Sequence, residues 1–287
     1  GDTKIDQALA GQVAGLQVTK NSGMPGEGSY INLRGIRSLT ADNAPLVVIN
    51  NVPYLFDSRQ SPLIGGFSRN MFQDYSLNDI ANITVLKGDE TSLYGSLGSN
   101  GVIMVETNGA NAEDMDTRVS FYGKYGVAWN SKRMPLLSGK DYKSYLTDVG
   151  MTYFNEQENM FNEFPFLGSS NDKYGYLYNF QTNWQDLLYR NAFVTDNTAR
   201  IEGGDEIAKY DLSLGYSRDE GILKGTSLDD YHTQLNADVM ISKWVSMNAT
   251  VGMSYLSGKY QNQGMSAEYN PLLAAYARSP FLSPYET

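Results

Sequence analysis

The stretch between Pro53 and Tyr75 holds the side chains of this sequence that are best suited to bind a ligand. It carries aromatic rings and arginines without helical or strand periodicity, which indicates a loop. Such groups bind sugars or peptides by stacking and hydrogen bonding. A loop packed in the interior of the protein would carry the same residues, so both interpretations stay open. The candidate substrate-binding residues are Tyr54, Phe56, Arg59, Arg69, Phe72 and Tyr75.

Catalysis is not expected, because the sequence lacks the usual pairs of nucleophile and base. His232 is the single histidine, and there is no cysteine. Carboxylate pairs remain, but they occur throughout a chain with 32 acidic residues and therefore identify no site. His232 lies on the polar side of an alternating run, where a hydrogen-bonding side chain is expected and a metal ligand is not.

No metal site and no cofactor are expected either. Without cysteine, neither a disulfide nor a thiolate metal site can form. Glu113, Asp114 and Asp116 crowd together, but they lack the ordered ligand spacing of a calcium loop. A solvated acidic turn is the expected structure there, and calcium binding is the alternative.

Charge and glycine spacing exclude two further classes of ligand. The net charge is -10 and the pI is near 4.6, which argues against a nucleic-acid partner because phosphate binding needs clustered lysine and arginine. Gly26 and Gly28 lack the third glycine of a dinucleotide-binding loop, and no Gly-Lys-Ser/Thr motif is present. The glycines are therefore interpreted as tight turns.

Residues 1 to about 108 are predicted to form a mixed α/β domain that carries the candidate loop. Apolar residues recur at helical spacing from Ile5 to Leu16, and Gly15 would end that helix. Short helices are also expected after Ser76 and over Asp89–Tyr94. Short apolar runs rich in β-branched residues predict strands. These runs are Leu16–Thr19, Tyr30–Leu33, Leu46–Ile49, Ile83–Leu86 and Val102–Val105.

A polar linker, residues 109–117, leads to a second region in which apolar and polar side chains alternate over long runs. Strands of roughly ten residues with one apolar face are typical of a membrane β-barrel, whereas strands of a soluble sandwich average about five or six residues. No run of about 20 apolar residues offers a transmembrane helix, and a spanning protein without such helices is a closed barrel. The alternating runs begin at Val119, Phe193, Tyr210, Tyr231 and Val245, and the run Phe193–Ile201 is the weakest.

The connections between these runs favour the barrel. Segments 203–206 and 242–244 are short, whereas segments 131–191, 218–230 and 257–287 are long. Outer-membrane barrels have short turns on one side of the membrane and long loops on the other. Single-chain barrels need at least about eight strands, so the remaining strands are expected beyond Thr287. Aromatics that could form interfacial girdles are Trp129, Tyr216, Tyr231, Trp244 and Tyr255.

A series of short motifs runs through the N-terminal region. They are residues 6–18, Ser22–Gly26, Ile31–Gly35, Pro45–Ile49, Val85–Lys87, Leu93–Gly95 and Ser99–Ile103. In order and spacing they resemble the plug domain of TonB-dependent outer-membrane transporters, in particular the SusC-like (SusC/RagA) branch of Bacteroidota. The resemblance continues at Trp184–Asp186, Tyr210–Tyr216, Glu220–Leu223 and Asn270–Pro271. The sequence departs from the family pattern at Asn50–Asn51, Lys87–Glu90 and Glu106–Asn108.

This resemblance implies an α+β plug domain over residues 1–108, a linker over 109–117, and the N-terminal part of a large outer-membrane β-barrel with extracellular loops over 118–287. The barrel is expected to be incomplete in this chain. The family's TonB-box segment and the small β-domain before it would lie N-terminal to Gly1. Arg34 and Lys87 are expected to contact the barrel wall from the plug, although Arg34 would also suit an ordinary turn.

The resemblance further implies TonB-dependent import of an oligosaccharide or peptide across the outer membrane of a Gram-negative bacterium. The implied partners are a SusD-like surface lipoprotein that lids the barrel, the TonB energising complex, and outer-membrane lipid. A siderophore or vitamin receptor is the alternative within the family. A surface-attached, β-rich glycan-binding module is the alternative outside it, and it would dissolve without detergent.

Overall fold

The computed structural model describes residues 4–54, 64–109, 115–168, 175–266 and 268–285. The chain divides into two units. The first unit comprises Gly1–Ala128, Ala192–Gly221 and Gly225–Tyr260, and the second comprises Trp129–Asn191, Ile222–Lys224 and Gln261–Thr287. The first unit therefore holds both the N-terminal region and the long alternating strands.

Two small sheets build the N-terminal region of the first unit. Strands β1 (Leu16–Thr19) and β2 (Tyr30–Leu33) pair antiparallel. A four-stranded sheet has the order β4-β3-β6-β5, with β3 (Leu46–Ile49) parallel to β6 (Val102–Thr107). Its edge strands are β4 (Val52–Tyr54) and β5 (Ile80–Leu86). The predicted strands are confirmed, and β4 is an addition after the turn at Asn50 and Asn51.

The core of this region lies between α1 (Ile5–Leu9), the short 3-10 helix η1 (Met71–Asp74) and the small sheets. β-branched and aliphatic side chains dominate it because a pleated surface packs them well. Burying such side chains contributes roughly 1.5–3 kcal/mol each. The buried members are Ile5, Leu9, Leu16, Ile31, Leu33, Val47, Ile49, Phe72, Ile103 and Val105.

Helix α1 is shorter than its apolar spacing predicts. It ends at Leu9, and Gly11 follows with a φ of 75°, a left-handed conformation that glycine adopts without a steric penalty. Val13 still packs against the core from the turn that follows. The other predicted helices form 3-10 turns, η2 (Leu77–Asp79) and η3 (Asp89–Gly98), and η3 is kinked at Gly95.

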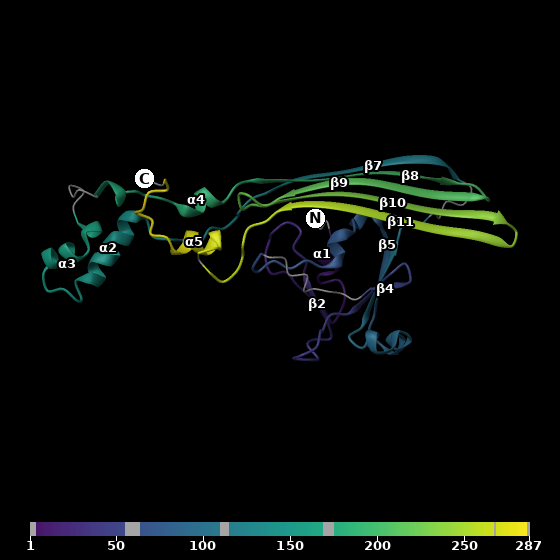
Figure 1. Cartoon of the computed structure of the whole chain (residues 1–287), viewed down its shortest axis with the longest axis horizontal. Helices are drawn as coiled ribbons and strands as arrows, with labels where there is room; N and C mark the ends of the chain where they lie inside the picture. Colours follow the sequence, from purple (N-terminus) through teal and green to yellow (C-terminus); the bar gives the residue numbers. More distant parts are fainter. Residues whose placement is uncertain (1–3, 55–63, 110–114, 169–174, 267, 286–287) are drawn as a thin grey trace. The chain divides into compact units, whose positions relative to one another are not determined.

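The alternating runs form one five-stranded antiparallel sheet, drawn in teal to yellow-green in Figure 1. Its order along the sheet is the order along the chain, so that each strand pairs with its neighbour in sequence. The strands are 13 to 16 residues long, well above the length typical of soluble sheets. They are β7 (Met115–Ala128), β8 (Ala192–Gly204), β9 (Ala208–Glu220), β10 (Ser227–Ser242) and β11 (Val245–Lys259).

Two connections of this sheet are tight turns, between β8 and β9 and between β10 and β11, as the sequence predicts. The connection predicted as a long segment over 218–230 is shorter, because β9 and β10 extend into it. A hydrogen bond from the Gly221 amide to the Thr226 carbonyl (3.0 Å) closes that connection. Strand pairing therefore continues beyond the region of clear alternation.

The second unit is built of short helices and extended segments. It contains α2 (Gly139–Gly150), α3 (Gln157–Glu163), α4 (Trp184–Leu188) and α5 (Pro271–Ala277), with 3-10 turns η4 (Pro165–Leu167) and η5 (Gly175–Leu177). Ser138 caps α2 by accepting a hydrogen bond from the Asp141 amide (3.2 Å). None of the helices that the structure describes is long and apolar enough to cross a membrane.

Candidate functional site

The inner face of the five-stranded sheet is polar and is buried along the central strands β8, β9 and β10, whereas the outer face is apolar and exposed. On β10 the polar residues Asp230, His232 and Gln234 are 1%, 8% and 6% exposed. Tyr231 and Leu235, which alternate with them, are 49% and 39% exposed. This is the reverse of the pattern in a soluble sheet, where the apolar face is buried.

The outer face presents apolar side chains from β7, β9, β10 and β11. A soluble monomer rarely exposes such a continuous surface, whereas a wall strand in lipid requires it. Trp129 and Trp244 lie exposed at strand ends, where aromatic girdles are found in membrane barrels. The exposed outer residues are Val119, Phe121, Tyr125, Val127, Leu214, Tyr231, Leu235, Val245, Met247, Val251, Met253 and Tyr255.

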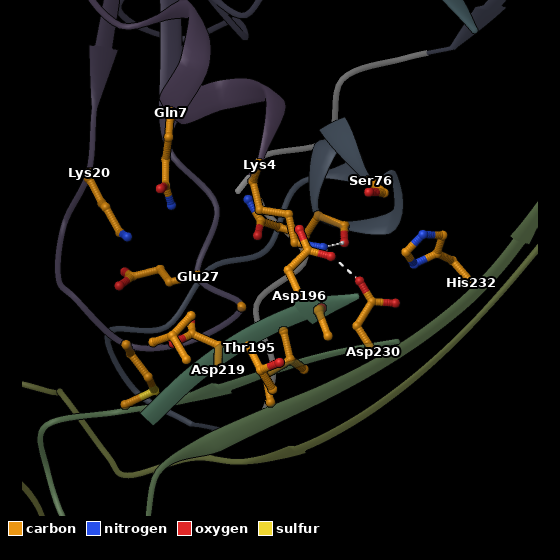
Figure 2. A pocket seen from close by; sticks show the side chains of 16 residues that line it. Lys4, Gln7, Lys20, Glu27, Ser76, Thr195, Asp196, Asp219, Asp230 and His232 are labelled. Carbon is orange, nitrogen blue, oxygen red and sulfur yellow. Dashed lines mark hydrogen bonds and ion pairs between the residues drawn. The ribbon is translucent and has the colours of Figure 1, made fainter. Parts of the chain in front are cut away.

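The N-terminal region contacts this polar inner face through a buried ion pair. Lys4, which precedes α1, places its Nζ 2.7 Å from Asp230 Oδ2 on β10 and 2.9 Å from the Gln73 carbonyl. Figure 2 shows Lys4 and Asp230 directed toward each other across the space between helix and sheet. An ion pair removed from water in this way strongly disfavours the loss of either partner.

Asp6 fixes the position of Lys4, because its carboxylate anchors α1 within the N-terminal region. The Asp6 side chain is fully buried and accepts hydrogen bonds from the Ser29 amide (2.8 Å) and from Gln73 Nε2 (3.0 Å). The same glutamine accepts from Lys4 through its backbone carbonyl. The ammonium group is therefore held toward the sheet by the core of the region.

A second contact joins the end of η2 to strands β9 and β10. Ser213 Oγ donates to Asp79 Oδ1 (2.5 Å), and His232 Nε2 lies 3.5 Å from Asp79 Oδ2. Burial raises the pKa of Asp79, while the Ser213 hydrogen bond and the His232 charge act against that shift. Gly215 leaves room for the imidazole, since a Cβ at that position would lie 1.9 Å from His232 Nε2.

Two further contacts between the N-terminal region and the sheet are made by asparagine side chains. Asn78 Nδ2 donates to Thr198 Oγ1 on β8 (3.1 Å), and Asn236 Nδ2 on β10 donates to the Asn108 carbonyl (2.5 Å). Charged and amide groups of the N-terminal region thus contact the inner face on three adjacent strands, β8, β9 and β10. We call the contacts Lys4–Asp230, Asp79–Ser213, Asn78–Thr198 and Asn108–Asn236 the polar interface.

A small cavity lies beside Lys4 in this interface (Figure 2). Its volume is about 30 Å³, which is the size of a water molecule and far below that of a substrate site. Asp196, Asp219 and Asp230 line it from the sheet, and Glu27 lines it from the N-terminal region. Burial raises the pKa of Glu27, against the hydrogen bond from Ser22.

No group of histidine and carboxylate side chains in the described part of the chain is arranged to hold a metal ion. Glu113 and Asp114 lie outside the described residues, and Asp116 falls within β7. The polar interface joins the two parts of the first unit by hydrogen bonds and charge, and the ring of Phe67 also packs against that of Tyr260 beyond β11, with ring centres 4.5 Å apart.

The predicted substrate-binding residues lie at different depths. Tyr54 is 41% exposed on the edge strand β4, and Arg69 pairs with Asp74. Tyr75 is half-buried against the core, and burial, with the nearby Tyr54 and Asp74, raises its pKa. Phe56 and Arg59 lie outside the described residues.

Phe72 is fully buried in the core of the N-terminal region. A ring with no exposed surface contacts no substrate in this conformation, so Phe72 is better assigned to the stability of the core. The aromatic content of the loop could not reveal this, because η1 turns Phe72 and Gln73 into the interior of the N-terminal region.

Arg34 and Lys87 lie together on the N-terminal region, where they line a pocket of about 190 Å³ with Arg37. Arg34 adopts the left-handed backbone region with a φ of 62°, and Lys87 Nζ donates to the Ala14 carbonyl (3.1 Å). Within the described residues neither side chain pairs with the five-stranded sheet. Their contact with a barrel wall stays a prediction.

A larger pocket, of about 600 Å³, lies within the second unit. Its lining comes from segment 133–139, Tyr142 of α2, residues 181–185 and residues 276–280. Trp184 Nε1 donates to the Ser279 carbonyl (3.1 Å), and the Arg278 guanidinium lies 5.1 Å from the Trp184 ring centre. The volume is in the range of small-molecule sites.

Comparison with known proteins gives three findings at the level of sequence. A model of the TonB-dependent receptor plug domain matches residues 1–102. Over 99% of its length the chain is 30% identical to the TonB-dependent receptor SusC of Bacteroides thetaiotaomicron, of which it covers 26%. A TonB-dependent receptor of Formosa agariphila is 30% identical over 88% of the chain and is covered to 23%. The chain thus spans about a quarter of the length of these curated relatives.

Solved structures share the fold. The RagAB peptide importer in its open-open state matches with a TM-score of 0.74 at 23% identity, over 89% of this chain and 29% of that chain. The siderophore receptor PirA from Acinetobacter baumannii matches with a TM-score of 0.50 at 14% identity, over 95% of this chain and 34% of that chain. The predicted fold class, a mixed α/β region followed by part of a large antiparallel wall, is confirmed.

Proposed function

We propose that this protein imports a nutrient across the outer membrane. The premise is that residues 1–102 form a TonB-dependent receptor plug domain and that the chain is a homologue of SusC over nearly its whole length. The full protein would act as the channel of a complex of the SusC and RagA type. The nutrient would be an oligosaccharide or a peptide. No covalent bond is made or broken in this activity.

One observation carries the proposal, the reversed polarity of the five-stranded sheet. On its central strands the polar face is buried and the apolar face is exposed, as β10 shows most clearly. A wall between lipid and a hydrated lumen requires this arrangement. A soluble glycan-binding module would expose an aggregation-prone surface instead.

The polar interface fits a plug that must both seal and move. A plug packed on the wall by apolar contacts would expose them to water on opening, at about 25 cal/mol per Å². Hydrogen bonds and ion pairs can be exchanged for bonds to water, so their net stabilisation is modest at about 0.5–1.5 kcal/mol each. We propose that force from the TonB complex shifts this balance.

We assign residues 1–108 to the plug, 109–117 to the linker and 118–287 to the start of the wall and its extracellular loops. The second unit supplies the long loop segments, and its 600 Å³ pocket is the proposed place for substrate contact outside the membrane. The exposed Tyr54 and the half-buried Tyr75 are the proposed contacts on the plug. A SusD-like lipoprotein would close the complex from the cell surface.

A siderophore receptor is the second candidate function. It is supported by the shared fold of PirA, whose TM-score of 0.50 is lower than the 0.74 of the RagAB importer. A co-purifying surface lipoprotein would favour the SusC-like function, and iron-regulated uptake would favour the second.

The test uses the full-length protein in its native bacterium. A deletion strain is supplied with defined oligosaccharides, with peptides or with ferric siderophores as limiting nutrient. We expect loss of growth and of labelled uptake on one of the first two, and recovery with the reintroduced gene. An uncoupler that collapses the proton-motive force should abolish that uptake. Unchanged uptake of all three, or a water-soluble protein, would contradict the proposal.

A further inference from the structure

Around Lys4, the wall side of the polar interface carries several carboxylates. The cavity beside it is lined by three carboxylates of the wall, Asp196, Asp219 and Asp230, and Lys4 pairs directly with the last. Lys4 thus faces carboxylates on β8, β9 and β10, and a second plug lysine, Lys20, also lines the cavity (Figure 2). Removing Lys4 would leave the buried carboxylate of Asp230 without its ion-pair partner.

Burial makes the direct pair more than a surface contact. The side chains of Lys4 and Asp230 are 11% and 2% exposed. Exposed ion pairs contribute about 0–1 kcal/mol, whereas breaking a buried pair by removal of one partner costs about 3–5 kcal/mol. The Lys4–Asp230 pair joins plug to wall, whereas the Arg69–Asp74 pair lies within the plug and the Arg200–Asp211 pair lies within the wall.

Its place in the chain is also distinctive. Lys4 immediately precedes α1, and α1 is tied to the plug core through Asp6, Ser29 and Gln73. Lys4 also donates to the Gln73 carbonyl, so the same ammonium group links wall, helix and η1. A displacement of the chain at Lys4 therefore acts on the wall contact and on the helix together.

We infer that the Lys4–Asp230 pair is a latch that fastens the N-terminal end of the plug to β10, and that its release precedes separation of the rest of the polar interface. The inference rests on the proposed function, because the plug must move for transport. Asn78–Thr198 and Asn108–Asn236 are neutral amide contacts and yield after the charged one. The latch determines the rate at which the closed plug separates spontaneously from the wall, without an applied force.

The test uses the full-length protein in detergent micelles and in cells. Lys4→Met removes the cation and keeps a side chain of similar length, and Asp230→Asn removes one carboxylate charge. Hydrogen exchange at the amides of α1 should accelerate at least about tenfold in Lys4→Met. Asp230→Asn should have a smaller effect, since it leaves Lys4 facing Asp196 and Asp219.

A matched control pair lies within the wall. Arg200 pairs with Asp211, whose side chain is 3% exposed, and the charges of the two act on Asp79 but their hydrogen bonds do not reach Lys4 or α1. Arg200→Gln should therefore leave exchange at α1 unchanged. The exchanged pair, Lys4→Asp with Asp230→Lys, keeps the net charge and tests whether pairing itself matters. It should restore slow exchange at least partly, and the single effects should not add.

In cells, the latch variants should admit a large antibiotic that the intact outer membrane excludes, and Arg200→Gln should not. Equal exchange at α1 in Lys4→Met, Arg200→Gln and the wild type would overturn the latch. Acceleration in the exchanged pair as large as in Lys4→Met would also overturn it. Failure of the proposed function is distinguishable, because it would appear as absent uptake in the wild type while these exchange rates still differ.

Discussion

Gly215 on β9 makes room for the imidazole of His232 on the neighbouring strand β10. A Cβ there would lie 1.9 Å from His232 Nε2, whereas a Cβ at Gly252 on β11 meets no atom within 4 Å. Gly215→Ala should therefore force His232 away from Asp79 and destabilise the folded barrel by about 1–3 kcal/mol. Gly252→Ala should have little effect.

The two variants can be compared by thermal unfolding of the full-length protein, followed as loss of the compact form on semi-native gels. A lower midpoint for Gly215→Ala alone is the expected result. Equal midpoints for both variants would mean that His232 does not occupy the space beside Gly215.

Asp79 gives the interface a pH dependence whose sign follows from its burial. Desolvation raises its pKa above the ordinary value of 3.8, so the folded protein favours the protonated carboxyl. The contribution to stability is then fully present below the unfolded pKa and is lost as the pH rises through the folded pKa. Asp79→Asn stays neutral and removes this dependence.

The measurement is hydrogen exchange at η2 in wild type and Asp79→Asn between about pH 4 and about pH 7, corrected for intrinsic rates. The wild type should lose protection relative to the variant as the pH rises. Glu27, whose pKa is also raised by burial, is present in both proteins and cancels in the difference. A constant difference across this range would contradict the shift.

At the scale of elements, neighbouring residues of a wall strand point to opposite faces of the sheet. The effect of the same substitution on the two faces can therefore be compared directly. On β11, Val251 faces outward and Thr250 pairs with the inward-facing Asn236, and both are exposed in the described part of the chain. Arginine on a lipid face near the membrane centre costs about 2–4 kcal/mol, while lumen positions tolerate charge.

Val251→Arg should therefore lower the yield of folded protein in the outer membrane, and Thr250→Arg should leave it near the wild-type level. Heat-modifiable mobility of the extracted full-length protein reports the folded fraction. Two equally tolerated arginines are what a water-exposed sheet would give.

The elements differ in how far the sequence predicts them. Long wall strands carry their own signal, because period-two alternation survives even in β8, where Phe193–Ile201 is only the centre of a 13-residue strand. Helix α1 is predicted too long, since Gly11 interrupts a spacing that would otherwise continue. The 3-10 turns are too short to show a periodicity of apolar residues, so only their capping residues predict them.

The candidate site is less predictable than the strands. Polar residues on one face of β10 indicate a hydrated surface, but no local pattern pairs Asp230 with Lys4, which lies 226 residues away. Such a contact depends on strand register and on how the plug lies against the wall. Phe72 fails as a substrate contact for a similar reason, since the direction of its ring is set by η1 and the core.

At the scale of the whole molecule, plug and wall are complementary because each buries the other's polar face. The wall strands turn charged and amide groups to the plug and apolar groups outward. Burial of polar groups costs least when they are hydrogen-bonded, as Asp230, Ser213 and Asn236 are across the interface. A wall between lipid and a hydrated lumen has this arrangement of faces.

The most direct test of that central claim is fluorescence quenching by nitroxide-labelled lipids. Single cysteines replace Val251 and, separately, Thr250 in a version of the full-length protein without other cysteines, and each carries a small environment-sensitive fluorophore in reconstituted bilayers. The account predicts strong quenching at position 251 and weak quenching at position 250. Equal quenching at the two positions, or quenching stronger at 250, would contradict it.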